Sequence, residues 1–122
     1  MKLLLIEDNE EITEVIGFYC NSKGNIDCQI FNNGKEGLEA IRSKRFDLIL
    51  LDLAMPEFRY DVVKALKKEG LLESKNIVIF TASSDITLIE EIIKSGVKEV
   101  LKKPCSLDDL TNMIEKYRPR DA

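Results

Sequence analysis

The sequence has no histidine and only three cysteines, which excludes much of the metal and nucleophile chemistry that soluble enzymes use. Zinc sites and Ser/His or Cys/His nucleophiles need these residue types at short regular spacings, and no Cys-x-x-Cys pair occurs. Cys20, Cys28 and Cys105 are irregularly spaced. We interpret each as a small apolar residue that fills space in a protein of the reducing cytosol.

Long apolar runs and long basic runs are also missing. No run reaches the roughly 18 residues of a membrane span, and the first six residues are too few and too soon followed by acids for a signal peptide. The formal net charge is −4, from 18 basic and 22 acidic residues, which does not favour nucleic-acid binding. We therefore expect a cytoplasmic protein that contacts neither membrane nor nucleic acid directly.

The composition is that of one folded unit. Of the 122 residues, 44% are hydrophobic and 33% are charged, with 6 glycines and 3 prolines, which suits a globular chain with one continuous core. There is no internal linker, repeat or low-complexity segment. We expect one domain over residues 1–122, with its core at about 2–117 and a polar tail at 118–122.

Apolar runs predict five strands, of which four read as buried on both faces and one, the second, as an edge strand. The expected strands are Lys2–Glu7, Ile26–Phe31, Leu48–Leu53, Asn76–Thr81 and Glu99–Leu101. Apolar residues at helical spacing follow each strand. These helical faces are marked by Ile12/Val15/Ile16/Tyr19/Cys20, Leu38/Ile41, Val63/Leu66, Ile86/Ile89/Ile92/Ile93 and Leu107/Leu110/Ile114/Tyr117.

Local signals set the ends of these helices. Ser106 is a predicted N-cap, with two aspartates in the first turn behind it. The third helix should end near Gly70, and Ser95-Gly96 should end the fourth. Buried strands that alternate with helices predict an α/β fold, a doubly wound five-stranded parallel sheet of order 2-1-3-4-5 covered on both sides.

Charged and hydroxyl residues follow the strands of this predicted sheet. Glu7 and Asp8 follow the first strand, Asp52 ends the third, Thr81 ends the fourth, and Lys102-Lys103 ends the fifth. The first and third strands are neighbours where the strand order reverses, which is where such sheets bind ligands. We therefore expect these side chains to share one pocket, with Asp52 at its centre and both Glu7 and Asp8 at its rim.

The pocket's chemistry follows from its charges. Two carboxylates about 4 Å apart repel by roughly 4 kcal/mol at an effective dielectric near 20, which favours either a bound proton or a cation. Oxygen ligands without His or Cys favour Mg²⁺, with Mn²⁺ as the alternative. A carboxylate nucleophile beside a metal, a lysine and a hydroxyl suits phosphoryl transfer. Our hypothesis is that Asp52 accepts a phosphoryl group.

From Lys2 to Tyr117 the chain resembles the receiver domain of two-component response regulators. The resemblance rests on Glu7-Asp8, Asp52-x-x-Met55-Pro56, Thr81-Ala82 and Lys103-Pro104, four motifs in the right order, each at a strand end. It implies a CheY-like, flavodoxin-like (βα)5 three-layer sandwich. It further implies a phosphoprotein of a phosphorelay, which takes its phosphoryl group from the phosphohistidine of a sensor histidine kinase or of a phosphotransfer protein.

The resemblance also assigns roles to individual residues. Glu7, Asp8, Asp52 and the backbone carbonyl of Ala54 would hold Mg²⁺. Thr81 and Lys103 would contact the phosphoryl group, and a cis bond before Pro104 would aim Lys103 into the pocket. The family's usual output and dimer face, made by the helix near 86–93, the strand near 99–101 and the helix near 107–117, would bind the downstream target. The chain itself would be a monomer or a weak homodimer.

The chain departs from the family pattern at several positions. Val100 stands where the family usually has a switch aromatic, and Cys105 stands where phenylalanine is common. Residues 57–60, Glu-Phe-Arg-Tyr, replace a glycine-rich turn, and Ala54 and Ser83 occupy positions thought to tune phosphate loss. These departures motivate a second hypothesis, a degenerate receiver that binds partners independently of phosphorylation.

Other interpretations explain the motifs less well. An aspartate-nucleophile phosphatase would need an acid two residues after Asp52, where Ala54 stands, so we expect no enzyme beyond self-phosphorylation and self-dephosphorylation. A flavin site is disfavoured because the acidic run at residues 7–11 would repel a phosphate. Asp8 or Asn9 alone would also serve as a helix N-cap. The isoleucines at 86–93 should be mostly core, with some left for a partner surface.

Overall fold

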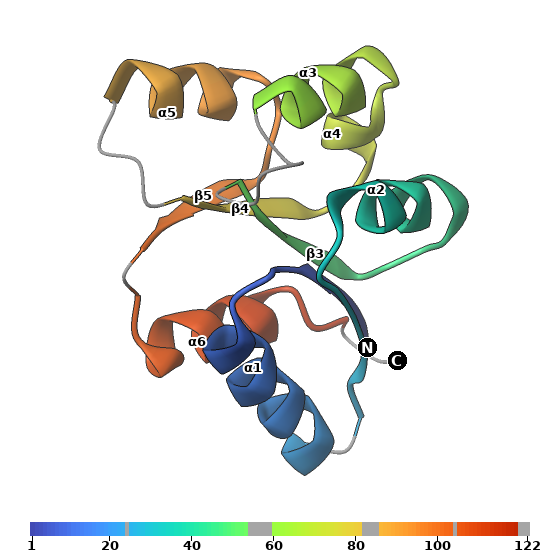
Figure 1. Cartoon of the computed structure of the whole chain (residues 1–122), viewed down its shortest axis with the longest axis vertical. Coiled ribbons are helices and arrows are strands. Elements are labelled where there is room, and N and C mark those ends of the chain that lie inside the picture. Colours follow the sequence, from blue (N-terminus) through green and yellow to red (C-terminus); the bar gives the residue numbers. More distant parts are fainter. Residues whose placement is uncertain (24, 54–59, 82–85, 104, 120–122) are drawn as a thin grey trace.

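Five parallel strands form one sheet in the order β2-β1-β3-β4-β5, as the sequence predicts (Figure 1). This is a computed structural model, and it describes residues 1–23, 25–53, 60–81, 86–103 and 105–119. The strands are β1 (Lys2–Ile6), β2 (Asp27–Phe31), β3 (Leu48–Asp52), β4 (Ile77–Thr81) and β5 (Glu99–Lys102). The fold is a flavodoxin-like α/β fold.

Helices cover both faces of the sheet. They are α1 (Glu10–Lys23), α2 (Gly34–Ser43), α3 (Tyr60–Lys68), α4 (Leu71–Ser74), α5 (Ile86–Lys94) and α6 (Leu107–Lys116). Figure 1 shows α1 and α6 on one face and the others on the opposite face. The single turn α4 was not predicted. Gly70, at a φ of 75°, separates it from α3 as expected, and the buried side chain of Leu72 anchors it in the core.

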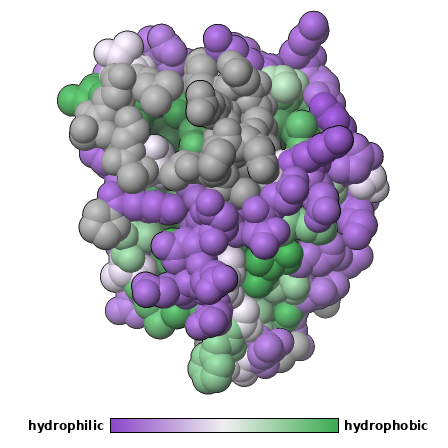
Figure 2. Space-filling view, in the orientation of Figure 1, coloured by the Kyte–Doolittle hydropathy of each residue, from purple (hydrophilic) through white to green (hydrophobic). Residues whose placement is uncertain are grey.

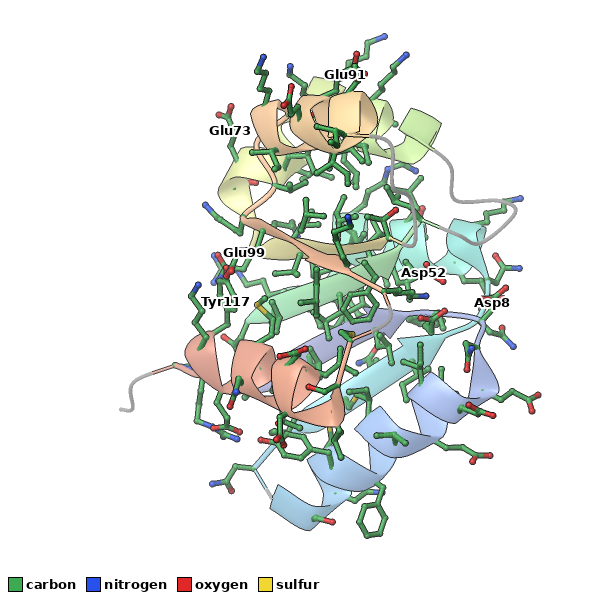
Figure 3. The ribbon with its side chains drawn as sticks, turned by 90° about the vertical axis from the view of Figure 1, so that its left-hand side faces the viewer. Asp8, Asp52, Glu73, Glu91, Glu99 and Tyr117 are labelled. Carbon is green, nitrogen blue, oxygen red and sulfur yellow. The ribbon has the colours of Figure 1, made fainter. Side chains whose placement is uncertain are left out.

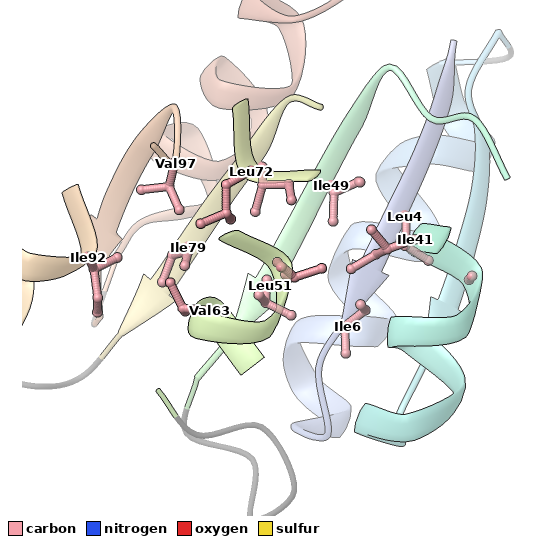
Figure 4. Close-up of a cluster of buried hydrophobic side chains, with 13 residues drawn as sticks. Leu4, Ile6, Ile41, Ile49, Leu51, Val63, Leu72, Ile79, Ile92 and Val97 are labelled. Carbon is pink, nitrogen blue, oxygen red and sulfur yellow. The ribbon is translucent and has the colours of Figure 1, made fainter. Parts of the chain in front are cut away.

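The apolar strands pack on both faces because neighbouring side chains point in opposite directions. Leu4 and Ile6 of β1 join the core beneath α2–α5, whereas Leu3 and Leu5 join the core beneath α1 and α6. Figure 4 shows the first of these cores. The continuous apolar runs therefore reflect two separate cores that share one sheet.

The predicted helix ends are confirmed. Ser106 accepts from the backbone N–H of Asp109, and Asp109 accepts in return from that of Ser106, which makes a capping box. Gly96, at a φ of 110°, follows α5. Asn9 caps α1, because its Oδ1 accepts from Ile12 N at 3.2 Å.

The isoleucines of α5 divide between core and solvent, as expected, although fewer of them are buried than the prediction of a mostly core stripe. Ile92 is buried in the core, but Ile86 is 69% exposed and Ile93 is 53% exposed. A single helix lying on a sheet shields only one stripe of its surface, so four isoleucines in eight residues exceed what that stripe can cover.

The surface seen in Figure 2 is mostly hydrophilic, with separate small apolar areas. Within the part of the chain that the structure describes, no helix combines the length and the apolar character that crossing a bilayer requires.

Candidate functional site

The predicted site residues lie at the carboxyl ends of the central strands. Asp52 is the last residue of β3, the middle strand of the sheet, and Thr81 is the last of β4. Glu7 directly follows β1, and its backbone N–H donates to the carbonyl of Phe31 at 3.0 Å, which continues the pairing with β2. Figure 3 shows Asp8 and Asp52 at the same end of the molecule.

Three carboxylates gather there. Glu7, Asp8 and Asp52 each place a carboxylate oxygen within 4.8 Å of the other two. Asp8 is exposed, as a residue at the rim should be, but Glu7 is as fully buried as Asp52. The prediction that both acids lie at the rim is therefore wrong for Glu7, because the strand pairing of β1 continues through this residue and keeps it inside the sheet.

The buried carboxylate of Glu7 is well supplied with donors. Its Oε2 accepts from the backbone N–H groups of Asp8 at 3.1 Å and of Asn9 at 3.3 Å. Its Oε1 accepts from Lys103 Nζ at 3.0 Å. Because Asn9 caps α1, the helix start does not account for the presence of Asp8.

Lys103 bridges two of the acids. Its Nζ lies 3.0 Å from Glu7 Oε1 and 3.1 Å from Asp52 Oδ1, and its side chain is only 17% exposed. Its backbone N–H donates to the Thr81 carbonyl at 2.8 Å, which holds the start of the loop after β5 against the end of β4. The neighbouring Lys102 is exposed, since side chains alternate along a strand.

Phe80 is a residue that the sequence reasoning overlooked. It is buried next to Thr81 in β4, and Lys103 Nζ lies 5.8 Å from its ring centroid. A ring at this distance attracts an ammonium group. Its position in a buried, mostly apolar strand gave no sign of this role, because the strand pattern explains a phenylalanine there without any charged neighbour.

Burial raises the pKa of Glu7 and lowers that of Lys103, and the neighbouring groups modify both shifts. Burial and a hydrogen bond with Asp52 raise the pKa of Glu7 to about 7, although Lys103 opposes that rise. Burial by itself lowers the pKa of Lys103, but its hydrogen bond with Glu7 and the charges of Asp52 and Glu7 outweigh burial and raise it. Lys103 therefore stays charged, and its charge is too small to offset the carboxylates around it.

The other predicted positions lie in different surroundings. Thr81 is buried at the end of β4. Val100 is half-buried and packs against the core beneath α2–α5, and Cys105 packs against the other core. Predictions for Ala54, residues 55–59, Ala82, Ser83 and Pro104 lie outside the described residues.

The donor set fits a hard divalent cation. Mg²⁺ binds oxygen ligands at about 2.0–2.1 Å, so ligand oxygens on opposite sides of the ion are roughly 4 Å apart. Three carboxylate oxygens within 4.8 Å of one another come close to this spacing. The cluster is typical of the Mg²⁺ site of a receiver domain.

Comparisons with known proteins agree with this site. The response regulator receiver domain family matches residues 3–115. The chain is 30% identical over 118 residues to the transcriptional regulatory protein CrdR of Helicobacter pylori, covering 95% of this chain and 54% of that protein, about half its length. It is 28% identical over 121 residues to the sporulation initiation phosphotransferase F of Bacillus subtilis, covering 97% and 94%.

A solved structure is also similar. The receiver domain of the Francisella response regulator 1452 superposes with a TM-score of 0.81 at 27% identity, covering 95% of this chain and 94% of that one. Receiver domains in general partner with histidine kinases or phosphotransferases and are generally classed as non-enzymes. With the sheet order, the acidic cluster and the family match in agreement, this chain belongs to the response regulator receiver domains of two-component or phosphorelay signalling.

Proposed function

We propose that this chain is a cytoplasmic phosphoacceptor switch, with residues 1–122 as one receiver domain and Asp52 as the acceptor. The observation that carries the proposal is the position of Asp52. It is a buried carboxylate at the end of the middle strand, 3.1 Å from an ammonium group and within 4.8 Å of two further carboxylates. Buried like charges destabilise a fold, so stability alone does not explain this cluster.

The chemistry is transfer of a phosphoryl group between two nucleophiles. An oxygen of Asp52 attacks the phosphorus of a phosphohistidine, the new O–P bond forms, and the N–P bond breaks. The electron pair of that bond leaves with the imidazole, which is a neutral leaving group once protonated. The donor would be the phosphohistidine of a sensor histidine kinase or of a phosphotransfer protein.

Each neighbour of Asp52 has a distinct part in this step. Lys103 places a positive charge beside the attacking oxygen and can follow the phosphoryl oxygens as charge develops on them. The Thr81 hydroxyl, at the end of the adjacent strand, is a donor for the same oxygens. Glu7, Asp8 and Asp52, together with the backbone carbonyl of Ala54, would hold Mg²⁺ (or Mn²⁺), which supplies further positive charge next to the acceptor.

The experiment is intact-mass measurement after incubation with acetyl phosphate, with Mg²⁺ and with EDTA. We expect a gain of about 80 Da, one HPO₃ on a nucleophilic carboxylate, only when Mg²⁺ is present. Asp52→Asn should abolish the gain. Asp47→Asn is the matched control, because Asp47 lies at the opposite end of the same sheet and should leave the gain unchanged. No gain in the wild-type chain, under conditions that label an established receiver, would contradict the proposal.

A second function has one observation in its favour. Position 100 is a valine, half-buried against the core, and because valine has no ring, the usual coupling in which an aromatic ring at this position turns inward is not available. A degenerate receiver would bind its partner equally with and without phosphate. Equal partner affinity of the chain with and without beryllofluoride, a phosphoryl mimic, would favour this second function.

We place the surface for a downstream target on α5, β5 and α6. Its apolar part is the exposed side of α5, where Ile86 and Ile93 stand out to solvent. Its polar part is the network in which Glu99 of β5 accepts from Lys116 Nζ at 2.7 Å and from the Tyr117 hydroxyl at 2.6 Å. The chain itself is then a monomer or a weak homodimer, which sedimentation of the phosphorylated and unphosphorylated forms would decide.

A further inference from the structure

A polar cavity lies at the amino ends of the strands, at the other end of the sheet from the acidic site. β1 begins at Lys2, and the residues just before β3 and β4 are Asp47 and Asn76. The cavity beside these strand starts measures about 480 Å³, within the roughly 300–1,000 Å³ of ligand pockets in proteins. Its lining includes Lys2, Arg45, Phe46, Asp47, Lys75 and Asn76.

The lining of this cavity is positively charged, although the chain as a whole carries a net charge of −4. Among the described residues that line it, three are cationic, namely Lys2, Arg45 and Lys75, and one, Asp47, is anionic. The carboxylate of Asp47 is already engaged, because its Oδ2 accepts from the backbone N–H of Lys2 at 2.7 Å. A cavity with this surplus of cations attracts an anion.

Two of the donors in the lining are held in place by the fold. Lys75 Nζ donates to the carbonyls of Ile41 at 2.7 Å and of Lys44 at 3.1 Å. Asn76 Nδ2 donates to the carbonyl of Asp47 at 3.0 Å. An ammonium group has three N–H bonds and a side-chain amide has two, so each residue keeps one donor for a ligand. Because both side chains are already ordered, binding costs them little conformational entropy.

The other two cations, Lys2 and Arg45, are not used by the fold. Both are exposed, and within the described part of the chain neither the ammonium group of Lys2 nor the guanidinium of Arg45 has a hydrogen bond or an ion pair. A cation just beyond a helix stabilises the partial negative charge at the helix end, and Arg45 lies two residues after α2. Lys75 already has that role through its bonds to carbonyls at the end of α2, so helix stability alone does not explain Arg45.

We propose that this cavity binds the phosphate groups of a small phosphorylated molecule. Arg45 offers a planar fork of N–H donors that matches phosphate oxygens, and the ammonium groups of Lys2 and Lys75 add positive charge. A phosphate group has more oxygens and more charge than a carboxylate, which suits a lining with three cations. The ring of Phe46, which packs against the core beneath α2–α5 and also lines the cavity, gives an apolar surface for the organic part of the ligand.

This binding is separate from phosphorylation of Asp52. Asp52 is the last residue of β3, whereas Asp47 directly precedes the first residue of the same strand, so the length of the strand divides the two sites. The chemistry also differs, because the acidic site needs a divalent cation before it can attract a phosphate, and the cavity supplies its own positive charge. Removal of divalent cations therefore distinguishes the two sites.

The test is an NMR titration of the nitrogen-15-labelled chain with ADP and, separately, with pyrophosphate, at low salt and with excess EDTA. We expect saturable shifts at the backbone amides of Arg45, Phe46 and Asp47 and none at Asp8. The affinity should fall as salt is added, and ADP should bind more tightly than pyrophosphate. Equal affinities for the two probes would overturn the part assigned to Phe46. No saturable shift at millimolar probe, or shifts confined to the acidic end of the sheet, would overturn the proposal.

Two substitutions in the lining should change the ADP affinity in opposite directions. Arg45→Gln should weaken binding by about tenfold, since it removes a charged donor, and it should fold normally because Arg45 is exposed. Asp47→Asn should tighten binding by about threefold, because it removes a negative charge and keeps an acceptor for the Lys2 N–H.

Lys102→Gln is the matched control. It removes one positive charge from an exposed residue at the opposite end of the sheet, and it should leave the ADP affinity nearly unchanged. Equal weakening by Arg45→Gln and Lys102→Gln would mean that ADP responds to the overall charge rather than to this cavity, and it would overturn the proposal.

Discussion

Two glutamates at opposite ends of the sheet show how differently this fold treats one residue type. Glu99 begins β5 at the amino end, where Lys116 and Tyr117 both donate to it and hold its pKa below the ordinary value despite its partial burial. Glu7 follows β1 at the carboxyl end, where burial and a neighbouring carboxyl raise its pKa to about 7. Figure 3 shows Glu99 and Asp52 far apart, toward opposite ends of the strands.

Other polar groups at the amino end follow the same pattern as Glu99. Asp47 accepts from the backbone N–H of Lys2 at 2.7 Å, and the side chain of Asn76 donates to the Asp47 carbonyl at 3.0 Å. Lys75 Nζ donates to the carbonyl of Ile41 at 2.7 Å. Charges there complete the turns that join strands and helices. At the carboxyl end, three carboxylates gather and Lys103 pairs with two of them, so the negative charge exceeds what folding requires.

Removing the Lys103 ammonium group from the carboxyl end of the sheet should have the largest effect on stability. Lys103→Met leaves Glu7 and Asp52 buried without its ammonium group, and we expect the free energy of unfolding at pH 7 to fall by about 2–3 kcal/mol, somewhat less than for a fully buried pair. Urea unfolding measures this change. Lys102→Met is the matched control, since Lys102 is exposed one residue away and should change stability by less than about 0.5 kcal/mol. Equal effects of the two variants would refute this account of the site.

Removing one acid from the same end should act in the opposite direction. Asp52→Asn eliminates the repulsion between two buried carboxylates and leaves Lys103 paired with Glu7, so we expect a gain of about 1–2 kcal/mol in EDTA. The pKa of Glu7 should fall, because Asp52 contributes to its rise through a hydrogen bond and through its charge. Carbon-13 NMR titration of the Glu7 carboxyl measures this fall. A destabilised variant in which the pKa of Glu7 is unchanged would contradict the prediction.

The two glutamates should give stability profiles of opposite sign against pH. Glu7 binds its proton more tightly in the folded state than at the ordinary pKa of 4.5, so its contribution is present below pH 4.5 and is lost as the pH rises through about 7. Glu7→Gln in EDTA should therefore gain stability relative to wild type between pH 5 and about 8. Thermal unfolding across this range is the measurement, and parallel profiles for the two proteins would argue against a raised pKa.

Glu99 should show the reverse profile with a smaller amplitude. Its pKa is lowered, so its contribution is present above the ordinary value of 4.5 and is lost as the pH falls through its folded-state pKa. Because Lys116 is 60% exposed and screened by solvent, we expect Glu99→Gln to cost less than about 1 kcal/mol at pH 7. The cost should shrink as the pH falls below 4.5, whereas a cost that grows at low pH would contradict a lowered pKa of Glu99.

The smallest effect is expected at Asp47. Its role is that of a hydrogen-bond acceptor for the Lys2 N–H, which an amide oxygen also fills, so Asp47→Asn should change stability by less than about 0.5 kcal/mol. Asp47→Ala removes the acceptor and should cost about 1 kcal/mol. Denaturant midpoints of the three proteins distinguish an acceptor from a needed charge. A large cost for the asparagine variant would show that the charge of Asp47 is needed, so that the two ends of the sheet would not differ as described.

Much of the fold and of the site followed from local patterns. The order of the strands followed from apolar runs alternating with helical spacings, and the convergence of Glu7, Asp8 and Asp52 followed from that order. The roles of these residues stay a prediction until phosphate is measured on Asp52. The spacing predicted that some isoleucines of α5 stay exposed but not which ones, and the structure leaves Ile86 and Ile93 exposed.

The sequence by itself determined the parallel sheet and which acids end its strands, because side-chain periodicity and strand ends are local properties. Only the tertiary structure decided that Glu7 is buried and that the Lys103 ammonium lies between two acids. Each of these features depends on distances between segments that are far apart in the sequence and close together in the fold. Such distances are set by packing of the whole core rather than by any run of residues.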